Sequence, residues 1–438
     1  MIPLTLSEVA AAAPGELRIA PGVDRVDGVT IDSRRAARGD LFVAVGRGVE
    51  YASDALERGA AAALLPDDAP AALAALAAAV RARSRARVVA ITGATGKTST
   101  KDILGALCAP VARTVVAEGS HNNEIGLPLT LCRIEEDTEV AVVEMGMRGV
   151  GQIAELCEIA RPDVAVITKI GPVHLELLGS VERVAAAKAE AITALPPRGS
   201  AIVPAGEPLL DPYLHRDDID IVRFGPGGDV QARSFVPAGN HSLLEADVAG
   251  ERVELRLSVS ARYNAENALA AVAAYRALGL PLAEVHRGAD QIRLSAWRGE
   301  EVELPEGTLL INDCYNANPI SMTAALAHLA ERAGERRKVA VLGDMAELGP
   351  GAAAYHREVG GAARQAGVEC LLAVGPLARE YIAGAAGVDE TRWVESAEDA
   401  LSALRELVRP GDAVLVKGSR AVGLEAIGSA LAAVPARG

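Results

Sequence analysis

The chain has 438 residues, half of them hydrophobic, which is enough for about two to four domains of roughly 100 to 200 residues and excludes a single small binding module. Its 44 basic and 58 acidic side chains give a formal net charge of −14, which disfavours capture of nucleic acid or of an anionic membrane. No apolar run reaches the ~18 uncharged residues of a membrane span and no basic-then-apolar signal begins the chain, so we expect a cytoplasmic protein without a membrane span.

The first 85 residues are predicted to form one α/β unit. The pattern predicts short strands over 28–34, 40–45 and 61–65, with a helix over 52–59. An alanine-rich helix is expected over 71–86, because alanine is the best helix former and the arginines gather at its end.

A second unit is predicted over 86–299. Apolar strands over 87–92, 140–143 and 164–167 are separated by helical stretches, and this alternation is typical of a parallel α/β sheet. Between 201 and 260 the pattern changes to short strands with proline and glycine, before an alanine-rich helix over 263–278.

A third unit is predicted over 300–438. Its strands are expected over 308–313, 339–342, 370–374 and 413–416, and a glycine-containing loop follows each of them. A second, separate doubly wound sheet is therefore expected, which makes the fold class α/β with three domains.

The composition singles out two residue types. The five cysteines are scattered, without CxxC pairs or histidines at metal-binding spacing, which indicates buried free thiols in a reducing compartment. Lysine is rare, and an ammonium group does chemistry that a guanidinium group cannot, so each lysine is a candidate for function. The lysines are Lys97, Lys101, Lys169, Lys188, Lys338 and Lys417.

The strongest local signal is the segment Thr92-Gly93-Ala94-Thr95-Gly96-Lys97-Thr98-Ser99, between an apolar strand and a helix. Glycines let backbone N–H groups surround phosphate oxygens at a helix N-terminus, Lys97 reaches the outer phosphates, and Thr98 supplies a hydroxyl for Mg²⁺. Ile91 stands where the usual phosphate-loop pattern has its first glycine. An ordinary strand-to-helix turn with an exposed lysine is the alternative, and the flanking elements favour nucleotide binding.

Three further residues are candidates for the chemistry of a phosphate site. Glu144 follows the strand over 140–143, where a carboxylate at the edge of a parallel sheet can bind Mg²⁺, although a solvated strand-end acid is the alternative. His174 follows the strand over 164–167, and a structural histidine is the more common reading. Lys188 lies in an alanine-rich helix of a chain whose usual cation is arginine, which suggests a reactive or modified amine.

Two asparagine-containing segments complete the set. Asn264-Ala265-Glu266-Asn267 opens the helix over 263–278, where either asparagine can be an N-cap. Asp313-Cys314-Tyr315-Asn316-Ala317-Asn318-Pro319 leads from a strand to a helix predicted over 321–332. Turn chemistry explains its asparagines, but it does not require an acid, a tyrosine and two amides together.

These segments together resemble the Mur ligase family of ATP-dependent amide-forming enzymes over nearly the whole chain. The phosphate loop alone is shared with the wider family, folate polyglutamate synthases included. The more specific segments are 121–128, 313–322, 342–349 with His356 beyond it, and 417–420, in the order that the family has them. They resemble the member that adds D-alanyl-D-alanine to a UDP-N-acetylmuramoyl-tripeptide.

The resemblance implies an N-terminal UDP-substrate domain (1–85), a central phosphate-loop ATPase domain with a parallel sheet (86–299) and a C-terminal Rossmann-like domain (300–438). It implies that ATP contacts Gly93, Ala94, Thr95, Gly96, Lys97, Thr98, Ser99, Asn267, Arg298 and Asp313. It assigns a first Mg²⁺ to Thr98 and Glu144 and a second to His174. Lys188 matches the lysine that relatives carbamylate with CO₂, which turns a cation into a carboxylate-like metal ligand.

The resemblance also implies the substrates and the reaction. The UDP-muramyl substrate is expected at Asp32, Ser33, Arg34, Asn122 and Asn123, and the acceptor dipeptide at Asn316, Asn318, Asp344, Glu347 and Arg420. ATP would phosphorylate the terminal carboxylate of the muramyl peptide, and the dipeptide amine would attack the acyl phosphate. The reaction belongs to cytoplasmic peptidoglycan precursor synthesis, and we expect a monomer.

Three departures from the family pattern mark a divergent member. The segment 46–53 lacks an Asp-Gly-His triplet, 203–207 lacks an Asn-x-Asp-Asp turn, and Tyr263 replaces a frequent histidine. Two alternatives stay open: a Mur or folate-type ligase that adds a single amino acid, and an ATP-binding regulatory or scaffold protein without ligation.

Overall fold

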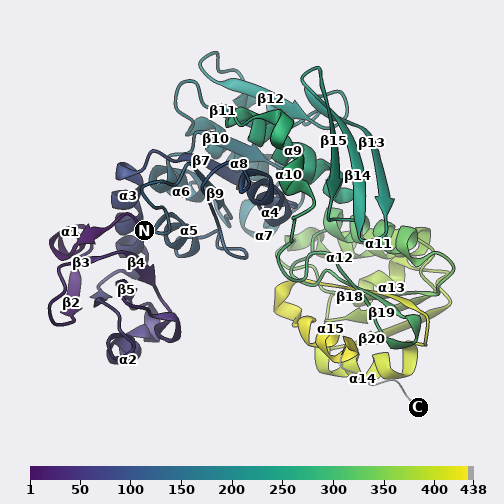
Figure 1. Ribbon diagram of the computed structural model, residues 1–438. Coiled ribbons are helices and arrows are strands. Elements are labelled where there is room, and N and C mark those ends of the chain that lie inside the picture. Colours follow the sequence, from purple (N-terminus) through teal and green to yellow (C-terminus); the bar gives the residue numbers. More distant parts are fainter. Residues whose placement is uncertain (433–438) are drawn as a thin grey trace.

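The computed structural model describes residues 1–432, and these form three α/β parts in chain order, each around its own main sheet. The first and third parts lie on opposite sides of the second (Figure 1). Among residues 1–432, no helix is both long and apolar enough to cross a bilayer. The five cysteines are buried free thiols, as the sequence predicts.

The first part has a four-stranded sheet in the order β2-β6-β5-β4, where only β2 runs antiparallel to its neighbour. The elements are β1 (Leu4–Thr5), α1 (Leu6–Ala12), β2 (Gly15–Ile19), β3 (Arg25–Val26), β4 (Gly28–Thr30), β5 (Asp40–Val43), α2 (Ala52–Glu57), β6 (Ala62–Pro66) and α3 (Ala69–Arg83). The strand predicted over 28–34 ends at Thr30, because Asp32 accepts a hydrogen bond from the backbone N–H of Arg34 and starts a 3₁₀ turn.

The second part has a nine-stranded sheet in the order β15-β14-β13-β12-β11-β10-β7-β9-β8. Its strands are β7 (Arg87–Thr92), β8 (Thr114–Val116), β9 (Val140–Glu144), β10 (Val164–Ile167), β11 (Ser200–Pro204), β12 (Asp220–Phe224), β13 (Val230–Ala238), β14 (His241–Val248) and β15 (Glu251–Leu257). Its helices are α4 (Lys97–Cys108), α5 (Gly126–Leu131), α6 (Gln152–Ala160), α7 (Leu175–Leu178), α8 (Val181–Thr193), α9 (Tyr263–Ala277) and α10 (His286–Ala289).

Strand β7 shows why this sheet is covered on both faces. Successive side chains of a strand point to opposite faces, so Val88 and Ala90 join one hydrophobic core while Val89 and Ile91 join another. The expectation of short strands over 201–260 is wrong for its second half, because β13, β14 and β15 have nine, eight and seven residues. They pair antiparallel and extend toward the third part (Figure 1).

The third part has a six-stranded sheet in the order β16-β17-β21-β18-β19-β20, parallel except for β16. Its elements are β16 (Glu300–Glu303), β17 (Leu309–Asn312), α11 (Pro319–Ala333), β18 (Lys338–Gly343), α12 (Ala352–Gln365), β19 (Cys370–Val374), α13 (Arg379–Gly384), β20 (Glu390–Val394), α14 (Ala397–Leu407), β21 (Ala413–Lys417) and α15 (Glu425–Ala432). The sequence predicts the four central strands but not the two edge strands, β16 and β20, because charged residues interrupt their apolar pattern. Residues 433–438 of the expected third domain lie outside the described residues.

Candidate active site

The phosphate loop connects β7 to α4, and two of its glycines are required by geometry. Gly93 has φ +151°, and a Cβ there would lie 1.9 Å from Oγ1 of Thr168. Gly96 has φ +84°, and a Cβ there would lie 2.3 Å from Oδ1 of Asn267. Lys97 is the first residue of α4, and its Nζ donates to the carbonyl of Gly93 at 2.9 Å.

A cavity of about 150 Å³ lies where this loop meets the third part. Its lining includes many of the residues expected from the sequence: Ala94, Thr95, Gly96, Lys97, Thr98, Ser99, Asn122, Glu144, Asn267, Arg298, Asp313, Asn316 and Asn318. It also includes residues that were not singled out as ligands: Thr168, Lys169, Glu266, Tyr315 and Lys417 among them. The scarcity of lysine pointed to Lys169 and Lys417, and Lys417 also lies in the segment 417–420 that resembles the family.

Glu144 and Thr98 provide the oxygens that a cation would need. Glu144 is 1% exposed, and its Oε1 accepts a hydrogen bond from Nδ2 of Asn122 at 2.8 Å. Its Oε2 is buried without a hydrogen-bond partner, so one acceptor remains open. Within residues 1–432 no group of three or more His, Cys, Asp or Glu side chains could hold a metal by itself. The donor set therefore fits Mg²⁺, which commonly binds one or two protein oxygens together with substrate phosphates.

Lys188 and His174 do not line this cavity. Lys188 is 1% exposed, and burial holds its pKa well below the usual value, with a further contribution from the charge of Lys97. No carboxylate opposes this shift, so the amine favours its neutral form. Burial also lowers the pKa of His174, while Glu347, in contact with its Nδ1, acts in the opposite direction.

Asn264 and Asn267 do not cap α9, so the N-cap reading is wrong. Both lie inside the helix, whose N-cap position is Arg262. Nδ2 of Asn267 donates to Oδ1 of Asn264 at 2.9 Å, and its Oδ1 accepts from Oγ1 of Thr100 at 3.4 Å. The pair therefore fixes the Asn267 amide beside the phosphate loop.

The turn over 313–318 closes the cavity from the third part. Lys417 is 2% exposed, and its Nζ donates to Oδ2 of Asp313 at 2.7 Å and to the carbonyl oxygens of Asp313 and Asn316. Asn318 caps α11 and donates from Nδ2 to the carbonyl of Ala94 at 3.2 Å. The phosphate loop and the turn are therefore in direct contact.

Three residues expected at the acceptor dipeptide lie outside the cavity. Asp344 accepts from the backbone N–H of Leu377 at 3.3 Å, and burial raises its pKa. Glu347 contacts His174, and Arg420 stacks on Trp297 with 4.5 Å between guanidinium carbon and ring centroid.

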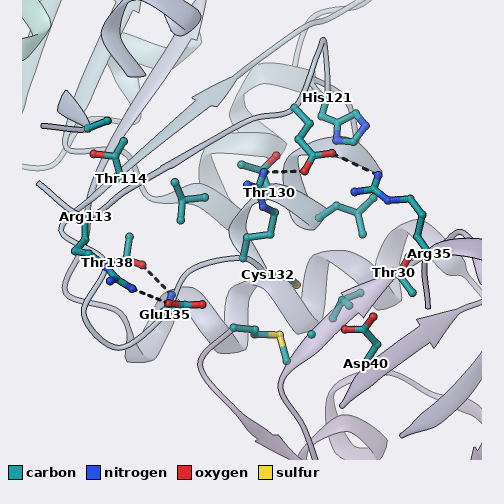
Figure 2. Close-up of a pocket in the computed structure, with 18 of the residues that line it drawn as sticks. Thr30, Arg35, Asp40, Arg113, Thr114, His121, Thr130, Cys132, Glu135 and Thr138 are labelled. Carbon is teal, nitrogen blue, oxygen red and sulfur yellow. Dashed lines mark hydrogen bonds and ion pairs between the residues drawn. The ribbon is translucent and has the colours of Figure 1, made fainter. Parts of the chain in front are cut away.

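A second, larger cleft of about 1000 Å³ lies between the first and second parts. Thr30, Arg35 and Asp40 form one wall, and Arg113, Thr114, Glu135 and Thr138 lie on the other (Figure 2). Arg35 pairs across it with Glu118 at 3.5 Å. Of the residues expected at the UDP-muramyl substrate, Asp32 lines this cleft; Ser33, Arg34, Asn122 and Asn123 do not.

These last residues have local roles in the structure. Ser33 is buried, and Arg34 pairs with Asp32 while its side chain remains 80% exposed. Oδ1 of Asn123 accepts from the backbone N–H of Gly126 at 2.9 Å, at the start of α5.

Residues 91–275 match the family model of the Mur ligase middle domain, and residues 297–420 match that of the Mur ligase glutamate ligase domain. The UDP-N-acetylmuramoyl-tripeptide–D-alanyl-D-alanine ligase of Escherichia coli is 35% identical over 98% of this chain and 99% of its own, and that of Bacillus subtilis is 32% identical over 98% of each. A crystal structure of MurF from Acinetobacter baumannii superposes with a TM-score of 0.85 at 28% identity, covering 98% of both chains. The MurF ligase of Thermotoga maritima in complex with ADP gives 0.77 at 27% identity, covering 92% of this chain and 96% of that one.

Proposed function

This chain belongs to the Mur ligase family, and on that premise we propose that it joins D-alanyl-D-alanine to UDP-N-acetylmuramoyl-tripeptide at the expense of ATP. The chain is a ligase of peptidoglycan precursor synthesis with the three-domain Mur ligase fold. The observation that carries the proposal is full-length similarity to relatives of this one specificity, together with a phosphate loop, an open buried carboxylate and a buried Asp–Lys pair around one cavity.

The phosphates of ATP bind the loop from Gly93 to Ser99, where Lys97 and Arg298 supply positive charge and the N-terminus of α4 adds its dipole. Asn267 lies on the adenine side and Asp313 on the ribose side. Lys417 keeps the Asp313 carboxylate in place, because its three donor contacts all end on the 313–316 turn.

Thr98 and Glu144 would hold Mg²⁺, with His174 and a carbamylated Lys188 as ligands of a second ion. When bound, Mg²⁺ lowers the repulsion between the substrate carboxylate and the ATP phosphates. The low pKa of Lys188 supports carbamylation, because only a neutral amine adds to CO₂; the C–N bond forms and the amine loses a proton.

The reaction has two covalent steps. A carboxylate oxygen of the muramyl peptide attacks the γ-phosphorus, the bond to the β-phosphate oxygen breaks, and ADP leaves. The amine of D-alanyl-D-alanine then attacks the acyl carbon, a proton is lost, and phosphate leaves from the tetrahedral intermediate. Lys97 and Arg298 stabilise the charge that develops on the phosphoryl oxygens. The contact of Asn318 with the phosphate loop helps to exclude water from the acyl phosphate.

The proposed domains are 1–85, 86–299 and 300–438, which separate the three main sheets. The cleft between the first two receives the sugar nucleotide near Asp32. Ser33, Arg34, Asn122 and Asn123 do not line this cleft and are kept as candidate contacts of the muramyl substrate on the family resemblance alone. We place the acceptor dipeptide beside Asn316 and Asn318, with Asp344, Glu347 and Arg420, which lie outside the cavity, as further candidate contacts. The protein acts in the cytoplasm as a monomer.

A product-mass assay tests this function. The enzyme receives ATP, Mg²⁺ and UDP-muramyl-tripeptide with either D-alanyl-D-alanine or a single amino acid, and both ADP and product mass are followed. We expect one product, heavier by the dipeptide less water. A product with a single amino acid alone would establish the alternative specificity, and nucleotide binding without any amide product would establish a scaffold.

A further inference from the structure

Arg298 reaches the phosphate loop from a segment that has no regular structure. Residues 292–299 connect α10 to β16, the passage from the second sheet to the third, without helix or strand. Nη2 of Arg298 nevertheless donates to Oγ1 of Thr98 at 3.0 Å, and its guanidinium lies 4.1 Å from the ring centroid of Tyr315. Its Nε is buried without a hydrogen-bond partner. An irregular segment does not by itself fix the position of a side chain, so contacts with other elements must position the Arg298 guanidinium.

Asp102 holds the segment three residues before Arg298. Its Oδ2 accepts two hydrogen bonds from Ser295, from the backbone N–H at 2.7 Å and from Oγ at 2.9 Å. Asp102 and Thr98 are four residues apart on α4, so they share one face of the helix. The 295–298 segment is therefore attached to the phosphate-loop helix at two points, Ser295 on Asp102 and Arg298 on Thr98.

Lys101 connects the Asp102 carboxylate to the backbone of Ala117, which follows β8. Its Nζ donates to Oδ1 of Asp102 at 2.5 Å and to the carbonyl of Ala117 at 2.7 Å, and the two side chains are 2% and 9% exposed. Ala117 precedes Ser120, whose Oγ lies 3.4 Å from Nη2 of Arg298. Lys101 therefore gives the buried Asp102 carboxylate an ion-pair partner on the same helix.

We infer that Asp102, supported by Lys101, is a positioning residue that holds Arg298 over the phosphate loop by fixing Ser295 on the helix face that carries Thr98. The inference rests on the proposed function, in which Arg298 contacts the transferred phosphate. Asp102 itself does not line the cavity, so it acts through Arg298.

A double-mutant cycle separates this role from a general structural one. Ser295→Ala removes one of the two bonds to Asp102 and leaves the buried Lys101–Asp102 pair intact, whereas Asp102→Asn breaks the pair and risks misfolding. We expect Ser295→Ala to lower kcat for ADP release on the order of fivefold, the effect of one hydrogen bond, with KM for the UDP-muramyl-tripeptide unchanged. In an Arg298→Ala background the same change should have no further effect. Ser295→Thr, which keeps the hydroxyl, should restore kcat.

Ser258→Ala is the matched control, because Ser258 is also half-buried near this segment and its Oγ makes a single hydrogen bond, to the carbonyl of Asp290. It should leave kcat unchanged. If Arg298→Ala lowers kcat but Ser295→Ala lowers it equally in both backgrounds, the positioning role is wrong while the proposed function stands. If Arg298→Ala leaves kcat unchanged, the phosphate role proposed for Arg298 fails, and the inference fails with it.

Discussion

Burial of Lys188 is the residue-scale feature that most directly predicts chemistry. Its amine is buried beside a cationic neighbour, Lys97, and both hold its pKa well below the usual value, which favours the carbamylation proposed above. A lysine kept only for solubility would be exposed.

We predict that Lys188→Ala lowers ligase activity roughly 100-fold, as expected for loss of a metal-site group. Formate or acetate should restore part of the rate by supplying the missing carboxylate, measured as ADP release with and without the anion. Lys338→Ala, at the start of β18, is the control and should keep full activity. Full activity of Lys188→Ala would contradict the proposed role.

His356 is a second buried residue whose protonation has a consequence. It is 0% exposed, its Nδ1 hydrogen-bonds with the carbonyl of Ala352 at 2.7 Å, and its Nε2 accepts from the backbone N–H of Met345 at 3.0 Å. Acceptance at Nε2 needs the neutral ring, whose single proton is then on Nδ1 and is donated to the Ala352 carbonyl. Burial lowers the pKa of His356 below 6.5, although Asp344 and Glu380 act in the opposite direction, and the ring of Tyr381 packs 4.7 Å away.

We therefore predict that His356 makes the protein less stable in mild acid. Below pH 6.5 the unfolded chain binds a proton that the folded one does not, so the free energy of unfolding falls as the pH decreases toward the folded-state pKa. His356→Gln keeps an acceptor without the titration, and its urea midpoint should fall less between pH 7 and pH 5 than that of the unmodified chain. If the urea midpoints of both proteins fall equally between pH 7 and pH 5, the prediction is wrong.

At the scale of elements, the start of α11 combines a helix cap with a domain contact. Oδ1 of Asn318 accepts from the backbone N–H of Ser321 at 2.9 Å, Pro319 occupies the first turn, and Nδ2 of Asn318 donates to the carbonyl of Ala94. The Asn318 amide thus accepts a hydrogen bond from the N-terminus of α11 and donates one to the phosphate loop.

We expect Asn318→Ala to lower the free energy of unfolding by about 1 kcal/mol and also to weaken ATP binding, since both contacts are lost. Ser396→Ala removes the cap of α14, where Oγ accepts from the backbone N–H of Asp399. Ser396→Ala should lower the free energy of unfolding by a similar amount. It should leave the ATP affinity, measured by titration calorimetry, unchanged. If both variants bind ATP equally well, Asn318 caps α11 but does not contribute to ATP binding.

At the scale of the whole molecule, the second and third parts are closed on one another. Asn318 contacts Ala94, His174 contacts Glu347, and the backbone N–H of Glu176 donates to the carbonyl of Glu347 at 3.2 Å. These contacts hold the second and third parts together beside the phosphate loop.

We predict that Glu347→Ala shifts the ligand-free protein toward an open arrangement, with a larger radius of gyration in small-angle X-ray scattering. ATP with UDP-muramyl-tripeptide should reverse the shift. Glu358→Ala, an exposed position on α12, should leave the radius unchanged. An unchanged radius in Glu347→Ala would show that its contact with His174 does not hold the closed state.

The amino-acid sequence was enough to predict the three α/β units, most of their central strands, the phosphate loop and the family. These are local features: apolar runs mark buried strands, and the glycines of a short loop are needed wherever φ is positive. The edge strands β16 and β20 were missed because their charged residues weaken the apolar pattern.

Contacts between residues far apart in the chain could not be predicted from the sequence and follow from the folded arrangement. Three contacts of the site join residues between 22 and 193 positions apart. They are the Asn122–Glu144 hydrogen bond, the Asp313–Lys417 pair and the hydrogen bond of Ser295 to Asp102. Such contacts depend on how whole sheets pack and how a connecting segment returns to a helix face. Asp344, Glu347 and Arg420 lie outside the cavity for the same reason, since a motif specifies side chains but not the position of its domain.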